Sequence, residues 1–181
     1  MSKFATDDDA PKRARRNDED GDLAIVGRSV TIARPRHELF AYWRDFTNLS
    51  TFMHAIERIE TNAQNRSVWT IKAPAGQHVT LETELVDVVD NQSIGWRSVE
   101  GSQIEATGVV TFADAPVDRG TIVTAEIGYK PPGGDVGRLF AKIFQAEPNI
   151  QVRHELKRFK MLMETGEIST AAFHTCQDGE H

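Results

Sequence analysis

Apolar and polar residues alternate along much of the chain between residues 24 and 130, with the period of two that a half-buried β-strand requires. The alternating segments are 24–33, 66–73, 78–89, 93–99, 103–113 and 120–130. Most of the connections between them are short and contain Asn, Asp, Gly or Pro, which favours hairpins between neighbouring strands. The pattern therefore predicts a curved antiparallel sheet of about seven strands with one apolar face.

The inward-facing positions of segment 78–89 change parity part-way along it. Up to Leu85 they are the odd-numbered positions, whereas Val86 and Val88 continue on the even-numbered ones. An extra residue in one strand of an antiparallel pair produces such a change. We therefore expect a β-bulge or a strong bend between Leu85 and Asp87.

Helical spacing interrupts the alternation directly after the first segment. Pro35 suits the first turn of a helix, where a missing N–H costs nothing. One apolar stripe then recurs at i, i+4 and i+7: Leu39, Trp43 and Phe46. Asp45 and Thr47 have side-chain oxygens suited to capping a second helical turn at 48–53. We predict two short helices that plug one end of the sheet with aromatic side chains.

A longer helical pattern follows the last alternating segment. After the breaker at 131–135, a first stripe is formed by Leu139, Phe140, Ile143 and Phe144. Pro148 interrupts or restarts the helix, and Gly166 is suited to end it. The stripe between them has the spacing i, i+4, i+7 and i+11: Val152, Leu156, Phe159 and Met163. The predicted class is α+β, with one curved sheet gripping one long C-terminal helix.

Length and composition fit one globular domain with loose ends. The chain has 181 residues, of which 39% are hydrophobic and 27% charged. We predict a disordered tail over 1–22, one domain over 23–168 and a second disordered tail over 169–181. The sequence has no secretory signal and no apolar run long enough for a membrane span, and Cys176 is its single cysteine. These features predict a cytoplasmic protein.

Charge argues against a nucleic-acid partner, because the formal net charge is −6. One basic cluster lies near the start of the chain: Lys12, Arg13, Arg15 and Arg16. Acidic residues flank it on both sides, so we interpret the segment as a solvated tail of mixed charge. We predict no nucleic-acid binding, and we leave open both a transient membrane contact and the oligomeric state.

The order of these elements and several local motifs resemble the polyketide cyclase/dehydrase family of the START-related, birch-pollen-allergen-like superfamily. The matching stretches, within about 25–168, are SVTIARPRHELFAYWRDFTNLSTFM, VWTIKAPAG, IGWRSVEG, GVVTF, GTIVTAEIGYKPPGG and RFKMLMETGEI. The pattern is also similar to a bacterial coenzyme Q-binding START-like subgroup. The resemblance implies a helix-grip fold with a cavity between sheet and C-terminal helix. Family members bind lipids, quinones, polyketides or other apolar molecules, and only some of them are enzymes.

Candidate ligand-binding residues lie on the inward faces of the predicted strands and on the helical stripe before Pro148. They are Trp69, Ile71, Leu81, Thr83, Trp96, Ser98, Ile104, Val110, Tyr129, Phe140 and Phe144. The alternative is that they only fill the core, as inward aromatics commonly do. Ala106 and Gly108 are small enough to leave room opposite the helix. We predict no cofactor and no metal site, because the histidines are scattered without ligand spacing.

Candidate catalytic groups are few. Glu82 and Glu84 share a face, but it lies opposite the apolar face, and Glu126 fails the same test. His54, near the expected pocket mouth, and Tyr129 are the remaining candidates for an acid or base. We therefore predict a binder of a hydrophobic small molecule, without assigning catalytic residues. The alternatives are a cyclase or dehydratase, and an interaction or stress protein with a vestigial cavity.

Overall fold

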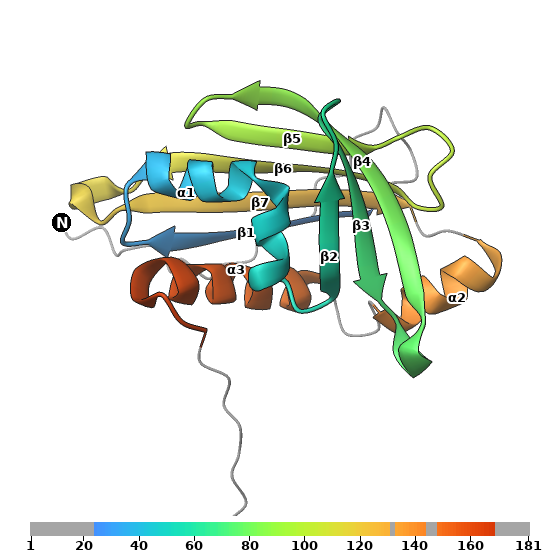
Figure 1. The fold of residues 1–181 in the computed structure, drawn as a ribbon. Helices are drawn as coiled ribbons and strands as arrows, with labels where there is room; N and C mark the ends of the chain where they lie inside the picture. The colour runs from blue at the N-terminus through green and yellow to red at the C-terminus, as the bar shows by residue number, and fades with distance from the viewer. Residues whose placement is uncertain (1–23, 131–132, 144–147, 169–181) are drawn as a thin grey trace, which may run out of the picture.

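The computed structural model describes residues 24–130, 133–143 and 148–168. Its central element is a seven-stranded antiparallel sheet in the order β1-β7-β6-β5-β4-β3-β2 (Figure 1). The strands are β1 (Ala24–Ile32), β2 (Ile56–Thr61), β3 (Arg66–Lys72), β4 (His78–Val89), β5 (Ser93–Ser98), β6 (Glu105–Asp114) and β7 (Thr121–Lys130). Each strand from β2 to β6 pairs with the next one along the chain, and β1 pairs with the other edge of β7. The predicted antiparallel sheet is confirmed.

Strand β2 was not among the segments predicted from the alternation of apolar and polar residues. Only Ile59 is fully buried in it, and its register with β3 shifts between Ile56 and Arg58. An edge strand with one buried side chain has no reason to alternate, because most of its residues meet solvent on both faces.

The predicted bulge in β4 is present. The register of β4 with β5 shifts between Val86 and Val89, and Asp87 has a φ of 49°. A residue in the left-handed region breaks the pleat, so the parity of the side chains reverses there.

Two short helices follow β1, as predicted: α1 (Arg36–Arg44) and the 3₁₀-helix η1 (Phe46–Thr51). Pro35 lies just before α1 with an extended ψ of 146°, so it precedes the first turn instead of forming it. The carboxylate of Asp45 accepts a hydrogen bond from the backbone N–H of Thr47 at 3.0 Å, which caps η1. Helix η1 begins earlier than expected, and the Thr47 hydroxyl donates to Asp45 instead of capping. Further 3₁₀ turns are η2 (Pro74–Gly76) and η3 (Pro116–Asp118).

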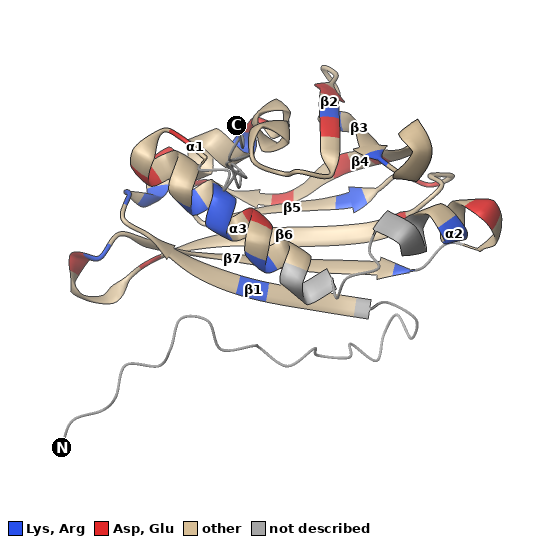
Figure 2. Cartoon of the chain, turned by 90° about the horizontal axis from the view of Figure 1, so that it is seen from below, with Lys and Arg blue, Asp and Glu red and all other residues tan. Residues whose placement is uncertain are grey.

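The C-terminal part forms α2 (Gly134–Ile143) and the long helix α3 (Pro148–Thr165). Helix α3 lies across the sheet beside β1, with charged residues of both signs along it (Figure 2). Its residues Leu156 and Phe159 are buried against the sheet, while Val152, Leu162 and Met163, also on α3, pack at the border of the core. The helix-grip arrangement of the α+β class is therefore confirmed, and Pro148 begins α3.

Aromatic rings close one end of the grip. The ring of Phe159 lies 5.0 Å from that of Trp43, 4.9 Å from that of Phe52 and 6.0 Å from that of Tyr42, measured between centroids. Phe52 and Phe159 have no exposed surface. The short helices after β1 thus supply the aromatic plug that their sequence predicts.

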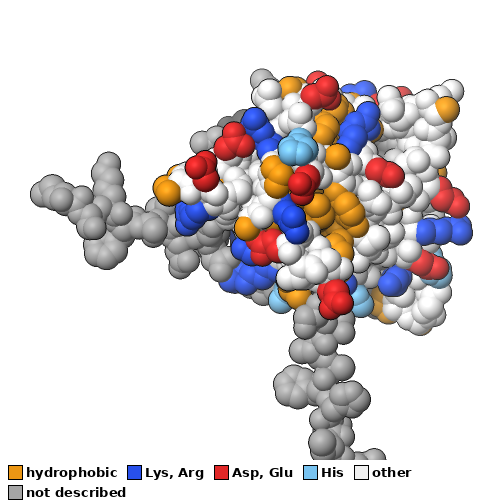
Figure 3. All heavy atoms as spheres, turned by 60° about the vertical axis from the view of Figure 1, so that its left-hand side comes forward, with side chains coloured by type: hydrophobic (Ala, Val, Ile, Leu, Met, Phe, Trp, Pro, Cys, Tyr) orange, Lys and Arg blue, Asp and Glu red, His pale blue; other side chains and the backbone are white. Residues whose placement is uncertain are grey.

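The two predicted tails, 1–22 and 169–181, lie outside the described residues. None of the described helices combines the length and the apolar character that crossing a membrane requires. Charged side chains of both signs are interspersed on the face shown in Figure 3, with apolar side chains gathered near its middle.

Candidate functional site

A cavity of about 170 Å³ lies between the inner face of the sheet, the first turns of α3 and the loop from η1 to β2. Most of its lining is apolar. The sheet and the residue directly before β6 contribute, among others, Trp69, Ile71, Leu81, Trp96, Ile104, Val110 and Tyr129. All of these were predicted as candidate ligand-binding residues, and the structure brings them to one cavity. Their role in binding remains a prediction.

Two other candidate residues, Thr83 and Ser98, are not among the described residues that line this cavity. Thr83 is buried, and its hydroxyl accepts a hydrogen bond from the indole N–H of Trp69 at 2.9 Å. The Ser98 hydroxyl accepts a hydrogen bond from the backbone N–H of Ala106 at 3.1 Å. Thr83 therefore orients the indole of Trp69 in the cavity wall, whereas Ser98 contributes a hydrogen bond between β5 and β6. The side chain of Phe140 and the whole of Phe144 lie outside the described part of the structure.

The room expected above Gly108 is already filled. A Cβ atom at that position would lie 2.5 Å from the indole ring of Trp96, so Gly108 is required for the close approach of this ring. Trp96 in turn lies 5.8 Å from Trp69, between ring centroids. The two indoles form a continuous aromatic wall, and the free volume lies elsewhere, beside Ala106 and α3.

The opposite wall was missed by the sequence reasoning. It comes from α3, from the loop between η1 and β2 and from the first residue of β2: Met53, Ala55, Ile56, Gln151, Val152, Glu155 and Leu156. The α3 stripe pointed to Val152 and Leu156, and Gln151 and Glu155 are their immediate neighbours with the same i, i+4 spacing. A helical projection of α3 onto the sheet would have placed this polar pair at the edge of the apolar stripe.

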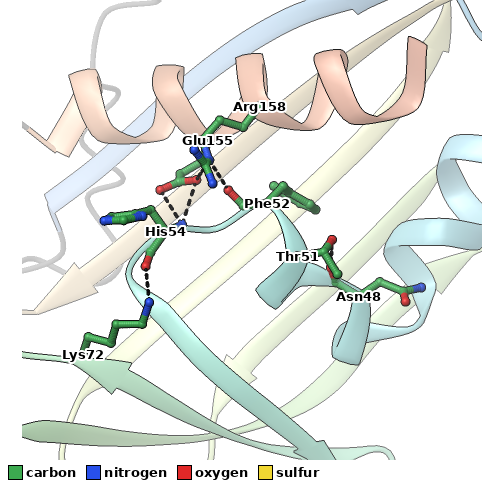
Figure 4. Close-up of polar contacts among 7 residues, drawn as sticks. All are labelled: Asn48, Thr51, Phe52, His54, Lys72, Glu155 and Arg158. Carbon is green, nitrogen blue, oxygen red and sulfur yellow. Dashed lines mark hydrogen bonds and ion pairs between the residues drawn. The ribbon is translucent and has the colours of Figure 1, made fainter. Parts of the chain in front are cut away.

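Glu155 is the charged group at the centre of the polar contacts in Figure 4. Its two carboxylate oxygens accept the backbone N–H of His54 at 3.0 and 3.1 Å. The Nε of Arg158 lies 3.7 Å from Glu155 Oε2 and donates to the carbonyl of Phe52 at 2.7 Å. The Nζ of Lys72 donates to the carbonyl of His54 at 3.2 Å. These contacts fix the loop at the cavity border to both α3 and β3.

Burial raises the pKa of Glu155 above its ordinary value, because the charged form loses solvation beside the apolar walls. The His54 N–H and the positive charge of Arg158 act in the opposite direction and stabilise the carboxylate. The side chain is only 15% exposed. A carboxyl group with a raised pKa at the wall of a cavity is a candidate functional group.

His54 has a different place from the one expected. Its backbone holds the loop through the contacts to Glu155 and Lys72, while the residue is exposed and is not among those that line the cavity. An acid–base role of the imidazole inside the cavity is therefore not supported by its position.

Glu82 and Glu84 lie on the outer face, as the sequence predicts, whereas Glu126, which was placed on the same face, is exposed but is also among the residues that line the cavity. Glu82 pairs with Arg66 at 3.9 Å, Glu84 pairs with Arg97 at 2.7 Å, and both pairs are partly exposed. Within the described residues, no group of three or more His, Cys, Asp or Glu side chains is arranged to hold a metal ion.

Comparison with known proteins identifies relatives of this chain. The profile of the family "Polyketide cyclase / dehydrase and lipid transport" matches residues 24–164. An uncharacterized 17.2 kDa protein in the melC2-rnhH intergenic region of Streptomyces lincolnensis is 26% identical over 144 residues, which cover 78% of this chain and 91% of that protein.

Solved structures show the same fold. The crystal structure of DR_A0006 from Deinococcus radiodurans is 36% identical, covers 80% of this chain and 100% of its own, and superposes with a TM-score of 0.64. The Zhui aromatase/cyclase from a Streptomyces species is 13% identical, covers 81% of this chain and 99% of its own, and has a TM-score of 0.58. At that identity the likeness extends to the fold alone.

Proposed function

We propose that this chain, which belongs to the polyketide cyclase/dehydrase and lipid transport family, binds a hydrophobic small molecule in the cavity between the sheet and α3. Candidate ligands are a lipid, a quinone or a polyketide-like molecule. The binding residues would be the sheet residues that line the cavity, among them Trp69, Trp96 and Tyr129. In this proposal the protein holds its ligand without transforming it.

The observation that carries the proposal is the apolar cavity itself. A closely packed interior of this size contains few voids larger than a water molecule. Here about 170 Å³ stays open although three tryptophans, Trp43, Trp69 and Trp96, lie at its walls. An apolar void attracts an apolar guest, because each buried methylene group contributes about 0.8 kcal/mol.

The size of the cavity limits the ligand. Sites for drug-sized molecules commonly have about 300–1,000 Å³, whereas this cavity has about 170 Å³. A compact molecule, or the head of a longer one whose remainder lies outside, fits this volume. A large polycyclic ligand would require α3 or the η1–β2 loop to move outward.

The proposal can be tested by a substitution on β6 that fills part of the cavity. Ala106→Phe introduces a ring at the cavity wall, and Ala113→Phe introduces the same ring on the exposed side of β6 as a matched control. We expect an apolar fluorescent probe to bind the wild type and the control, and its affinity to fall at least about tenfold in Ala106→Phe. Equal probe binding by all three proteins would place the binding site outside this cavity.

The alternative function, a cyclase or dehydratase, is favoured by one specific observation. Glu155 lies at the cavity wall, and burial raises its pKa, which is the direction that suits a carboxyl group for acid–base catalysis. Dehydration of a compact β-hydroxy ketone, followed by absorbance of the enone product, tests this function. The alternative requires activity that Glu155→Gln abolishes, and a wild type that binds the ketone without turnover would contradict it.

A further inference from the structure

We propose that the ligand of this cavity is a compact apolar molecule carrying a hydroxyl group, and that the carboxylate of Glu155 accepts a hydrogen bond from that hydroxyl. The inference rests on the proposed function, because it names the chemistry that the same cavity selects. Four observations carry it: the free acceptor capacity of Glu155, its place in the wall, the cation beside it and the cavity volume.

The first observation is the hydrogen bonding of Glu155. A carboxylate has two oxygens with about four acceptor sites. Among the described residues, the backbone N–H of His54 is the one donor within hydrogen-bonding distance, at 3.0 and 3.1 Å from the two oxygens. Arg158 Nε, at 3.7 Å, contributes charge but lies beyond that distance. With 15% of the side chain exposed, the remaining acceptor sites have limited access to water.

The second observation is the position of the carboxyl group. Glu155 lies where α3 meets the η1–β2 loop (Figure 4), and it lines the cavity together with Leu156 and Trp43. Gln151, one turn earlier on α3, also lines the cavity. Glu126 of β7 is the other acidic residue among those that line the cavity, and it is exposed. The polar groups of α3 therefore border a space with a mostly apolar lining, and a ligand with one polar end would orient that end toward them.

The third observation distinguishes a hydroxyl group from an ammonium group. The Nε of Arg158 lies 3.7 Å from Glu155 Oε2, so one cation already stands beside the carboxylate. A second positive charge at this point would be repelled by Arg158. A neutral donor gains a hydrogen bond to a charged acceptor without this repulsion.

The fourth observation is volume. An apolar cavity of about 150 Å³ in an engineered protein holds a benzene molecule, and this cavity has about 170 Å³. A single ring with one hydroxyl group thus matches both the space and the acceptor. Phenol and toluene are suitable probes, because they have nearly the same shape and differ in the donor.

The experiment measures the dissociation constants of phenol and toluene by isothermal titration calorimetry on the full chain. Glu155→Met replaces the acceptor by an apolar side chain of similar length. We expect the phenol-to-toluene affinity ratio to fall roughly tenfold in this variant, the value of one hydrogen bond to a charged group. Toluene should still bind. Glu155→Gln, which keeps a neutral acceptor and tests the inference if Glu155→Met does not fold, should lower the ratio several-fold.

Glu164→Met is the matched control. Glu164 is also on α3 and also accepts a backbone N–H, that of Ala33 at 2.7 Å, but it is not among the residues lining the cavity. Its substitution should leave the ratio unchanged. If both probes bind and the ratio is the same in the wild type and the Glu155 variants, the inference is wrong and the proposed function stands. If neither probe binds the wild type, the proposed function fails and the inference fails with it.

Discussion

The two halves of α3 cover the same sheet, but one half packs on a filled core and the other borders a cavity. In the second half, Phe159 is fully buried among aromatic rings, and Glu164 ties the helix to Ala33 at the end of β1. In the first half, Glu155 makes the equivalent bond to His54, yet a cavity remains beneath the helix. Two similar bonds from a carboxylate to a backbone N–H therefore hold one half of α3 against a filled core and the other half over a cavity.

The difference lies in what the chain places opposite each half. Helix α1 and the end of η1 bring the rings of Trp43 and Phe52 against Phe159 in the second half. The first half faces the smaller side chains of Ala55, Ala106 and Ala125, and the indoles of Trp69 and Trp96 stack along the wall. The aromatic rings fill the space under the second half of α3. Under the first half, the small alanine side chains leave space, because the hydrogen bonds of Glu155 hold the helix at a fixed distance from the sheet.

The largest expected effect is in the packed half. Phe159→Asp would bury a charge with no partner among aromatic rings, so we expect failure to fold or severe destabilisation. Lys157→Asp, two residues away and exposed, is the control and should fold normally. Far-UV circular dichroism and thermal melts measure both. A Phe159→Asp protein with normal stability would refute the packing of this half.

A pair of truncations compares the halves directly. Phe52→Ala in the packed half should cost about 3–5 kcal/mol of unfolding free energy, through lost burial and a new cavity. Trp96→Ala should cost less, because part of its ring already faces the existing void, and it should weaken binding of an apolar probe. Urea denaturation and probe titration measure the two effects. A full core-type loss for Trp96→Ala, with no probe binding by the wild type, would mean that both halves are solid.

A smaller effect concerns the pH dependence of stability. The pKa of Glu155 is raised in the folded state, so between the ordinary glutamate pKa, about 4.3, and the raised value the folded state binds more protons than the unfolded one. Stability then decreases as pH rises through this window. Glu155→Gln should remove that decrease, whereas Glu164→Gln leaves Glu155 and its contribution in place. Unfolding free energies from pH 4 upward, compared between variants, measure it; an unchanged profile in Glu155→Gln would contradict the assignment.

The smallest expected effect is that of the tails. Residues 1–22 and 169–181 contain few apolar side chains, so the chain from 23 to 168 should melt within about 5 °C of the full chain, which corresponds to roughly 1 kcal/mol. Differential scanning calorimetry measures the difference. A larger drop would show that a tail supports the fold, and removing each tail separately would show which one.

The sequence predicted the sheet wall of the candidate site but not the wall formed by α3. Trp69, Trp96 and Tyr129 alternate with polar residues, so their common inward face follows from the period of a strand. Glu155 was not identified, because a glutamate at the border of an apolar helical stripe is normally a solvated residue. Its burial depends on the η1–β2 loop, which is distant in sequence and is brought to it by the fold.

The sequence by itself determined the antiparallel sheet, the bulge near Asp87, the aromatic short helices and the long covering helix. These features depend on local periodicity, capping and turn residues, which are encoded over a few neighbouring positions. Tertiary structure alone decided that β2 forms the edge of the sheet, that the Trp96 ring takes the space above Gly108, and that a void lies beside Glu155. Each of these depends on the distance between surfaces far apart in the chain, and local patterns do not encode such distances.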